Sequence, residues 1–489
     1  MNTFYKIFRN ALSFLLAISL LGCSGKDNTY PEGPDDPPGN TNRIQVYLTR
    51  GDETKLFSHE AALSFRQSAS TGYPTIMVDT TQHFQEIEGF GAALTGSSAY
   101  LINRKLAGDA RTNLLNELFD PDKGIGLSYL RLTMGASDFS LSDFTYNDMP
   151  AGETDFALDH FSLSQDLQDV VPVLKEIVHM APAIPLLGSP WSPPAWMKTS
   201  GSLKGGKLKP ECYGVYSDYF VKYIQAMKAE GLTIDAVTIQ NEPLHFTANY
   251  PCMEMQAAEQ LDFVKNHLGP RFVAAGLDTK IIIYDHNWDE PEYPMTILDD
   301  ATARNYIAGS AFHAYAGDVS AMTMVHNAHP DKALYFTEIS GGAWATDFAG
   351  NLMWNMRNIF IGTTRNWSKN ALLWNLALNE HYGPQNNGCS NCRGVITINS
   401  VTASVTRNVE YYALAHFSKF VRPGAVRISA QVPGIAGETR AVAFQNRDGS
   451  KVMVIANYAG EMKGYAVNQN GREFVATLPP TSVITLVWE

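Results

Sequence analysis

The chain has 489 residues, of which 37 are Lys or Arg and 49 are Asp or Glu, giving a formal net charge of −12. Hydrophobic residues make up 45% and charged residues 18%, which is typical of globular proteins and excludes a disordered chain. The length allows a large core and a smaller second domain. The acidic balance argues against nucleic acid as a partner, because binding phosphates requires Lys and Arg. Five cysteines are an odd number, so at least one has a role other than pairing.

The N-terminus carries an export pattern. Lys6 and Arg9 precede an apolar run over residues 11–21, which is too short to span a bilayer permanently. The run ends in Leu-Leu-Gly before Cys23, which resembles the lipobox of bacterial lipoproteins. The resemblance implies removal of residues 1–22 and lipid attachment to Cys23; a plain secretory signal is the alternative. Residues 23–42, rich in Pro, Gly, Asp and Asn, predict a flexible tether. We therefore expect an exported protein held at a bacterial membrane through its lipid anchor only, at the outer membrane, the cell surface or the periplasmic face.

Short apolar runs alternate with helical patterns between residues 84 and 404. Eight runs have the length of strands, and most are continuously apolar, as expected for strands buried on both faces. They cover residues 86–93, 127–134, 183–190, 234–241, 280–286, 307–315, 333–340 and 370–378. Eight β-then-α units predict an α/β fold, a (β/α)₈ barrel over residues 84–404. An open doubly wound sheet is the alternative, which is disfavoured because no Gly-rich dinucleotide turn follows the first run.

The flanking segments follow a different pattern. Residues 43–83 and 405–489 alternate apolar and polar positions between turn signals, as half-buried strands do. The Asp448–Gly449 step between two such runs predicts a hairpin. We expect both segments to form one side β-sandwich beside the barrel.

Two glutamates lie where barrel enzymes carry their catalytic groups, at the C-terminal ends of strands. Glu242 follows the fourth apolar run and Glu338 ends the seventh. A glutamate after a buried strand is costly unless it is paired or functional, and a salt bridge is the ordinary explanation for one of them alone. Two facing carboxylates are the groups that glycoside hydrolysis requires, one as proton donor and one ionised.

Seven ordered motifs resemble glycoside hydrolase family 30, which includes glucosylceramidases and endo-β-1,6-glucanases. They are EGFGAALT from 88, LRLTMGASDF from 130, GSPWSPPAWMK from 188, QNEP from 240, TEI from 337, LWNLALN from 373 and HFSKF from 416. The resemblance implies a barrel with a side β-sandwich and a retaining double displacement. By motif position, it implies Glu242 as the acid/base and Glu338 as the nucleophile. Enzymes of this type need no cofactor or metal.

Polar residues at other strand ends are candidates for supporting the two glutamates. Arg131 lies inside the second run, where a permanently charged guanidinium needs a carboxylate, and we expect Glu338 to be that partner and to have its pKa lowered. His313 and Tyr315 end the sixth run. Tyr315 can hydrogen-bond the nucleophile and help keep it ionised, although a core tyrosine is nearly as well supported.

Other residues are candidates for contacting the sugar. Asn241 precedes the acid/base and can bond the 2-hydroxyl, and Asp138 can accept bonds from hydroxyls unless it caps a loop. Trp191 and Trp374 lie at the ends of the third and eighth strands. They can stack on or flank a sugar ring, or belong to the core. Three further tryptophans in loops after the runs are candidate stacking platforms: Trp196, Trp288 and Trp344.

The loop at 378–399 bears on the substrate. Glucosylceramidases carry Leu-Asn-x-x-Gly-Gly-Pro-Asn here and close in Pro-Ile-x-Val-Asp, whereas this loop ends differently and contains Gly-Cys-x-x-Cys-Arg-Gly. That form resembles the β-1,6-glucanase branch, so an endo-β-1,6-glucanase acting on a β-glucan or other β-glucoside is the preferred function. A glucosylceramidase or β-glucosidase of the same family is the alternative, and a non-catalytic glycan-binding lipoprotein represents a different class.

The cysteines permit a simple assignment. With Cys23 as the anchor, the remaining four cysteines can form two disulfides, and of the three pairings that four cysteines allow we predict Cys389–Cys392 and Cys212–Cys252. Zinc is disfavoured because no second Cys-x-x-Cys or spaced His pair follows. Asp285 and His286 end the fifth run and can coordinate a metal, but hydroxyl-binding or structural roles are preferred. We expect a monomer.

Overall fold

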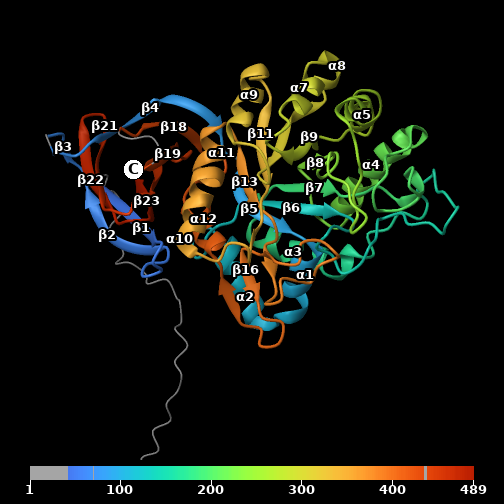
Figure 1. The fold of residues 1–489 in the computed structure, drawn as a ribbon, viewed down its shortest axis with the longest axis horizontal. Helices are drawn as coiled ribbons and strands as arrows, with labels where there is room; N and C mark the ends of the chain where they lie inside the picture. The colour runs from blue at the N-terminus through green and yellow to red at the C-terminus, as the bar shows by residue number, and fades with distance from the viewer. Residues whose placement is uncertain (1–41, 70, 434–437) are drawn as a thin grey trace, which may run out of the picture. The chain divides into compact units, whose positions relative to one another are not determined.

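The computed structural model describes residues 42–69, 71–433 and 438–489; the predicted signal peptide, Cys23 and the tether up to residue 41 lie outside them. Eight parallel strands form the barrel at the right of Figure 1. They are β5 (Gly89–Leu94), β6 (Tyr129–Met134), β7 (Leu186–Pro190), β8 (Ala236–Thr238), β9 (Lys280–Asn287), β10 (Ile307–His313), β11 (Ala333–Glu338) and β13 (Asn370–Leu373). The circle closes where the Lys369 amide donates to the Leu334 carbonyl at 2.8 Å. The predicted barrel is confirmed.

Helices follow each strand and cover the outside of the barrel (Figure 1). They are α1 (Gly96–Tyr100), α2 (Gly108–Phe119), α3 (Val170–Met180), α4 (Tyr213–Ala229), α5 (Ala257–Phe263), α6 (Gly269–Ala274), α7 (Glu292–Leu298), α8 (Ala301–Arg304), α9 (Ser320–Ala328), α10 (Phe348–Trp354), α11 (Ile361–Arg365) and α12 (Val409–Ser418). Among the described helices, none combines the length and apolar character that a membrane crossing requires.

The barrel interior is filled by side chains. One buried cluster takes a single residue from each of seven strands: Tyr129, Leu187, Ala236, Ile282, Ala311, Tyr335 and Leu372. Such a layer makes the barrel a packed core, so the chemistry is confined to its ends. Close packing of β5 on β6 also explains one glycine of the EGFGAALT motif, because a Cβ at Gly91 would lie 1.8 Å from the Tyr129 carbonyl oxygen.

The side domain is a ten-stranded sheet that combines both ends of the described chain, coloured blue and red at the left of Figure 1. Its strands are β1 (Arg43–Arg50), β2 (Ser58–Ser64), β3 (Arg66–Gln67), β4 (Thr75–Glu86), β18 (Val426–Gln431), β19 (Thr439–Gln445), β20 (Lys451–Asn457), β21 (Lys463–Gln469), β22 (Arg472–Leu478) and β23 (Ser482–Trp488). Their inward side chains form a separate apolar core, as in a β-sandwich. The predicted hairpin is confirmed, since β19 and β20 pair antiparallel around Gly449, whose φ is 86°.

Helix α12 is buried along its whole length and joins the barrel to the sandwich. His416 on this helix bonds Thr485 through Nδ1 and Thr49 through Nε2, both at 2.8 Å. Thr49 lies in β1 and Thr485 in β23, so one imidazole links helix α12 to both ends of the described chain. Burial lowers the pKa of His416 to about 3, so the ring is neutral here.

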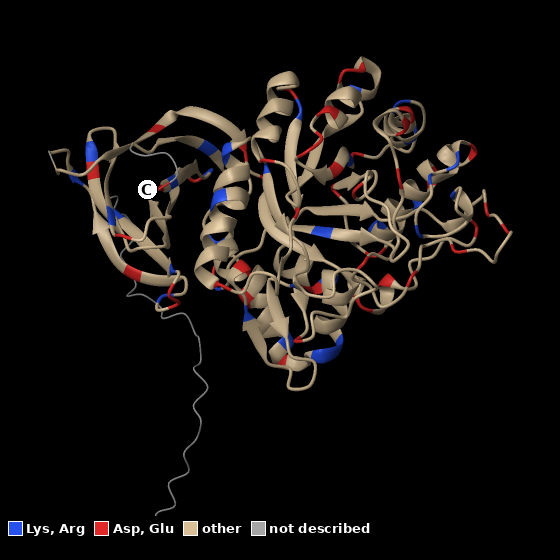
Figure 2. Cartoon of the chain, viewed as in Figure 1, with Lys and Arg blue, Asp and Glu red and all other residues tan. Residues whose placement is uncertain are grey.

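Two strands are shorter than their apolar runs predict. The run 234–241 contains only the three residues of β8, and the chain bends at residue 239 directly after them. The run 370–378 is divided into β13 and β14 (Ala377–Leu378) by Asn375, which has a φ of 57°. The strands of the barrel are almost free of charged residues in Figure 2, whereas the surrounding helices and loops carry both signs. Charges inside the barrel are therefore exceptional.

Candidate active site

Glu338 and Glu242 meet at the C-terminal end of the barrel. Glu338 is the last residue of β11 and is nearly buried, and Glu242 lies in the loop that follows β8. A carboxylate oxygen of one lies within 4.8 Å of a carboxylate oxygen of the other. Retaining glycosidases hold their carboxyl groups about 5–5.5 Å apart and inverting enzymes about 6.5–9.5 Å apart. The spacing matches the retaining arrangement.

The backbone holds Glu242 in an unusual conformation. Its φ is 47°, in the left-handed region that residues other than glycine rarely adopt. Its amide donates to the Asp285 carbonyl at 3.0 Å, and its own carbonyl accepts from the His245 amide at 2.8 Å. Such conformations persist where the surroundings determine them, and they cluster at functional sites.

Arg131 is fully buried at the centre of the site and bonds several carboxylate and polar groups. Its Nη1 donates to Glu338 Oε2, which is the contact predicted from the sequence. Its Nη2 donates to Asp285 Oδ2 and to Asn241 Oδ1, both at 2.7 Å. Because Asn241 Oδ1 accepts from Arg131, the side-chain amide is held in one orientation, and its nitrogen can donate to a sugar hydroxyl. Tyr315 donates its hydroxyl to Glu338 Oε1 at 2.9 Å, as the sequence also suggested.

Asp285 is the site residue whose importance the sequence did not show. This fully buried carboxylate accepts five hydrogen bonds from five different strands. The donors are Arg131 (2.7 Å), Ser189 (2.7 Å), Thr238 (2.8 Å), Thr337 (2.6 Å) and His313 (3.1 Å). Burial raises the pKa of Asp285, but Arg131 and the other donors outweigh it and hold the pKa well below its ordinary value. A charged residue inside an apolar strand was the available signal, and it is the same signal that identified Arg131.

His313 connects Asp285 to Glu242. Its Nε2 lies 3.1 Å from Asp285 Oδ1 and its Nδ1 lies 3.0 Å from Glu242 Oε1. An ionised carboxylate can only accept, so Nε2 must carry a proton. The contact between Nδ1 and Glu242 then requires one more proton, which either the imidazole or the glutamate holds.

The charges around these groups determine where that proton resides. Burial lowers the pKa of His313, but Glu338, Asp285 and Glu242 together raise it to about 9. Burial raises the pKa of Glu242, and the hydrogen bond to protonated His313 outweighs it and lowers that pKa to about 2. Both directions favour His313 over Glu242 as the holder of the shared proton in the free protein. For Glu338, burial raises the pKa and outweighs the opposing charges of His313 and Arg131. The lowering of this pKa that the sequence predicted is therefore wrong for the free protein, because the carboxyl group is buried and lies beside Glu242.

The remaining sugar-binding candidates form the walls of the same site. Trp191 and Trp374 are buried and stack on each other with ring centroids 5.0 Å apart, and the Arg131 guanidinium lies 4.9 Å from the Trp191 ring. Asp138 is half-buried beside Gly388, where an added Cβ would approach its Oδ2 to 2.9 Å. Burial raises the pKa of Asp138 well above its ordinary value, and the charges of Glu338 and Glu242 add to this.

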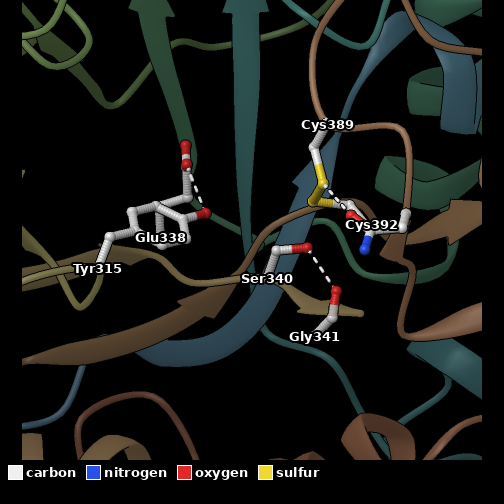
Figure 3. The surroundings of a disulfide bond; sticks show 7 residues. Tyr315, Glu338, Ser340, Gly341, Cys389 and Cys392 are labelled. Atoms are coloured by element: carbon white, nitrogen blue, oxygen red, sulfur yellow. Dashed lines mark hydrogen bonds between the residues drawn. A yellow bond between two sulfur atoms is a disulfide. The ribbon is translucent and has the colours of Figure 1, made fainter. Parts of the chain in front are cut away.

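The predicted disulfide between Cys389 and Cys392 is present and lies close to the nucleophile candidate (Figure 3). Cys392 begins β15 (Cys392–Arg393), which pairs antiparallel with β12 (Gly341–Gly342), three residues after Glu338. Arg393 is anchored in turn by an ion pair with Glu410 at 2.7 Å on helix α12. The loop after β14 is thus fastened to the segment that extends β11.

The predicted Cys212–Cys252 disulfide is wrong, since both thiols are free and buried. Cys212 packs in the main hydrophobic core, whereas the Cys252 sulfur accepts the amides of Gly205 in the loop after β7 (3.2 Å) and of Thr247 in its own loop (3.1 Å). The prediction assumed that cysteines on neighbouring loops meet, but these two side chains pack in different environments. Buried Lys198 stabilises this region instead, and its Nζ donates to the Cys252 carbonyl at 2.6 Å.

Glu242, His313 and Glu338 also bring potential metal-binding atoms within 4.8 Å of one another. Those atoms are already engaged in hydrogen bonds with one another, with Arg131 and with Tyr315. The guanidinium of Arg131 supplies positive charge at the same place, so we assign these groups to hydrogen bonding.

Comparison with known proteins agrees with this geometry. The family model described as the glycosyl hydrolase family 30 TIM-barrel domain matches residues 87–421, and the family 30 beta sandwich domain matches residues 424–486. An endo-1,6-beta-D-glucanase of Neurospora crassa is 37% identical, over 91% of this chain and 94% of its own length. Putative glucosylceramidase 4 of Caenorhabditis elegans is 30% identical, over 86% and 85%. The solved structure of the endo-beta1,6-glucanase BT3312 has a TM-score of 0.84 and 37% identity, covering 91% of this chain and 99% of that one. The chain belongs to glycoside hydrolase family 30.

Proposed function

We propose that this protein is a retaining endo-β-1,6-glucanase in which Glu338 is the nucleophile and Glu242 the acid/base. The observation that carries the proposal is the close pair of carboxylates at the barrel end, each held by different partners. The relatives named as endo-1,6-beta-glucanases are 31–37% identical to this chain over most of its length. Those named as glucosylceramidases share about 30% or less, so a glucosylceramidase is the second candidate.

The partners of the two glutamates support different roles. Glu338 accepts from the guanidinium of Arg131 and from the Tyr315 hydroxyl, and both donors favour an ionised carboxylate ready to attack the anomeric carbon. Glu242 contacts His313 instead, which can supply the proton that the leaving oxygen needs.

The arrangement couples proton delivery to nucleophilic attack. The charge of Glu338 is one of the main causes that raise the pKa of His313. When Glu338 forms its bond to the anomeric carbon, that charge is consumed and the pKa of His313 falls. The proton then moves toward Glu242 and on to the leaving oxygen as the glycosidic bond breaks. In the second step, water loses a proton to Glu242 while it releases the sugar from Glu338.

Asp285 serves as a positioning residue in this scheme. Because its carboxylate is ionised, it fixes the Nε2–H form of His313 and directs Nδ1 at Glu242. Trp191 and Trp374 would wall the sugar, with Asn241 donating to its 2-hydroxyl and Asp138 binding another hydroxyl.

The direct test is product analysis with purified protein on glucans of defined linkage. We expect short oligosaccharides from a β-1,6-glucan and much slower release from β-1,3- and β-1,4-glucans. Faster hydrolysis of glucosylceramide than of the glucan would favour the second candidate. Binding of the glucan without release of sugar would favour a non-catalytic glycan-binding protein.

We also propose that the protein is exported and lipid-anchored through Cys23, on the pattern of residues 1–23. Replacing Cys23 by serine should abolish incorporation of a labelled fatty acid and move the protein from the membrane fraction to the soluble fraction. Retention of the label in that variant would contradict the anchor.

A further inference from the structure

A cavity of about 500 Å³ lies beside Glu338, at the C-terminal ends of β10, β11 and β13. Its lining includes Tyr315, Trp344, Trp354, Asp347, Asn351 and Asn355. The volume falls within the roughly 300–1,000 Å³ of small-molecule sites. No step of the double displacement uses this cavity.

Three aromatic rings of the lining are unusually exposed. The exposed fraction is 55% for Trp344, 42% for Trp354 and 45% for Tyr315. Exposed aromatic rings gathered around one hollow indicate a binding site, because burying them against a partner is favourable. The lining also carries a carboxylate and two side-chain amides, which suit the hydroxyl groups of a sugar better than a hydrocarbon chain.

The wall that bears Trp344 is held by the chain itself. The Trp344 ring packs over Gly342, where an added Cβ would lie 2.0 Å from it. Gly342 pairs with Cys392 of the disulfide, and the Ala343 amide donates to the Asn391 carbonyl at 2.8 Å. The hydrogen bond from the Gly350 amide to Asp347 at 2.6 Å caps the helix that bears Trp354. The cavity is therefore formed before a ligand arrives, which reduces the entropic cost of binding.

The cavity adjoins the reacting centre through Tyr315. The tyrosine ring lines the cavity while its hydroxyl bonds Glu338 at 2.9 Å. Ile339 and Ser340, which follow Glu338 directly, also line it. A polymer whose cleaved unit contacts Glu338 therefore has this cavity within reach of its neighbouring units.

We infer that this cavity is a glucan subsite, in which Trp344 and Trp354 stack on glucosyl units next to the cleaved linkage. The inference rests on the proposed function, since it takes the β-1,6-glucan as occupant. An endo-acting enzyme needs such contacts, because binding energy from units remote from the cleaved bond assists the chemistry.

The test compares substrates of different length. Trp344→Ala and Trp354→Ala should each lower the ratio of kcat/KM for a β-1,6-linked glucose hexamer to that for the trimer by roughly tenfold. Trp344→Phe and Trp354→Phe should restore much of the ratio, because a ring is retained. Tyr73→Ala is the matched control, since Tyr73 is 46% exposed but precedes a sandwich strand. Calorimetric binding of the hexamer to each variant in a Glu338→Gln background separates binding from chemistry.

The outcomes distinguish this inference from the proposed function. Cleavage of β-1,6-glucan by the wild type with unchanged ratios in both alanine variants would overturn the subsite alone. An equal loss for trimer and hexamer would also overturn it, because it indicates only a structural role. A wild type that cleaves no β-1,6-glucan would overturn the proposed function and this occupant together. If Trp344→Ala and Trp354→Ala lowered the rate of glucosylceramide hydrolysis alone, the cavity would be assigned to a lipid chain instead.

Discussion

Replacing Glu338 by glutamine is expected to lower kcat/KM on a β-1,6-glucan by about 10⁴-fold or more, because the residue that we propose as the nucleophile of the double displacement is lost. Glutamine has nearly the same shape and can still accept from Arg131, so the fold should persist. The measurements are initial rates of reducing-sugar release and thermal unfolding. Glu292→Gln makes the same change at an exposed site on α7 and should leave both rates and stability unchanged.

Comparison with Glu242→Gln separates the two roles. Loss of a general acid costs about 10²–10⁴-fold for a sugar leaving group. Glu242→Gln should lower the rate of the first step far less with an aryl glucoside, because the aryl leaving group needs little protonation. Glu338→Gln should be inactive on both substrates. If Glu338→Gln kept its activity on the aryl glucoside and Glu242→Gln did not, the roles assigned to the two glutamates would have to be exchanged.

Replacing Asp285 by asparagine is expected to affect both activity and stability. Asp285 is one of the groups that raise the pKa of His313 to about 9, so removing its charge should lower that pKa. The alkaline limb of the pH profile of kcat/KM should therefore move to lower pH, with about a hundredfold loss of activity near neutral pH. A uniform loss at every pH, with no shift of the limb, would leave Asp285 a purely structural role.

The stability effect has its own pH dependence. Arg131 would lose one of its buried carboxylate partners, which costs about 3 kcal/mol of the free energy of unfolding. Because the pKa of Asp285 is held well below its ordinary value, this stabilisation is present at neutral pH and is lost as the pH falls below about 4. The difference from wild type in urea unfolding should shrink accordingly in acid. Asp278→Asn, an exposed change at the other end of β9, should show neither effect.

The contacts that the sequence predicted share one physical basis. An arginine inside an apolar strand must find a carboxylate, and strand ends of a barrel converge, so the sequence alone assigns Glu338 to Arg131 as its partner. The same convergence suggested the contact between Tyr315 and Glu338. Alternation of polar and apolar residues predicted the hairpin around Gly449 equally well.

The failures also share a cause. Asp285, like Arg131, is a charged residue inside an apolar strand. Nothing in its local sequence, however, indicates that groups on five strands converge on it. The pairing of Cys212 with Cys252 failed because proximity of two loops does not determine where their side chains point. The cavity beside Trp344 depends on the packing of β12 against β15, two short strands that no periodicity indicates.

By itself, the sequence determined the barrel, the side sandwich and the two glutamates, because burial periodicity and strand ends are local properties of the chain. Only the tertiary structure decided which groups share a proton, since His313, Asp285 and Glu242 come from separate strands and loops. It also decided how the cysteines are used: within the described residues, one disulfide closes a loop at the active site and two thiols are free. Those outcomes depend on distances across the barrel, which are set by how its strands close and not by any one of them.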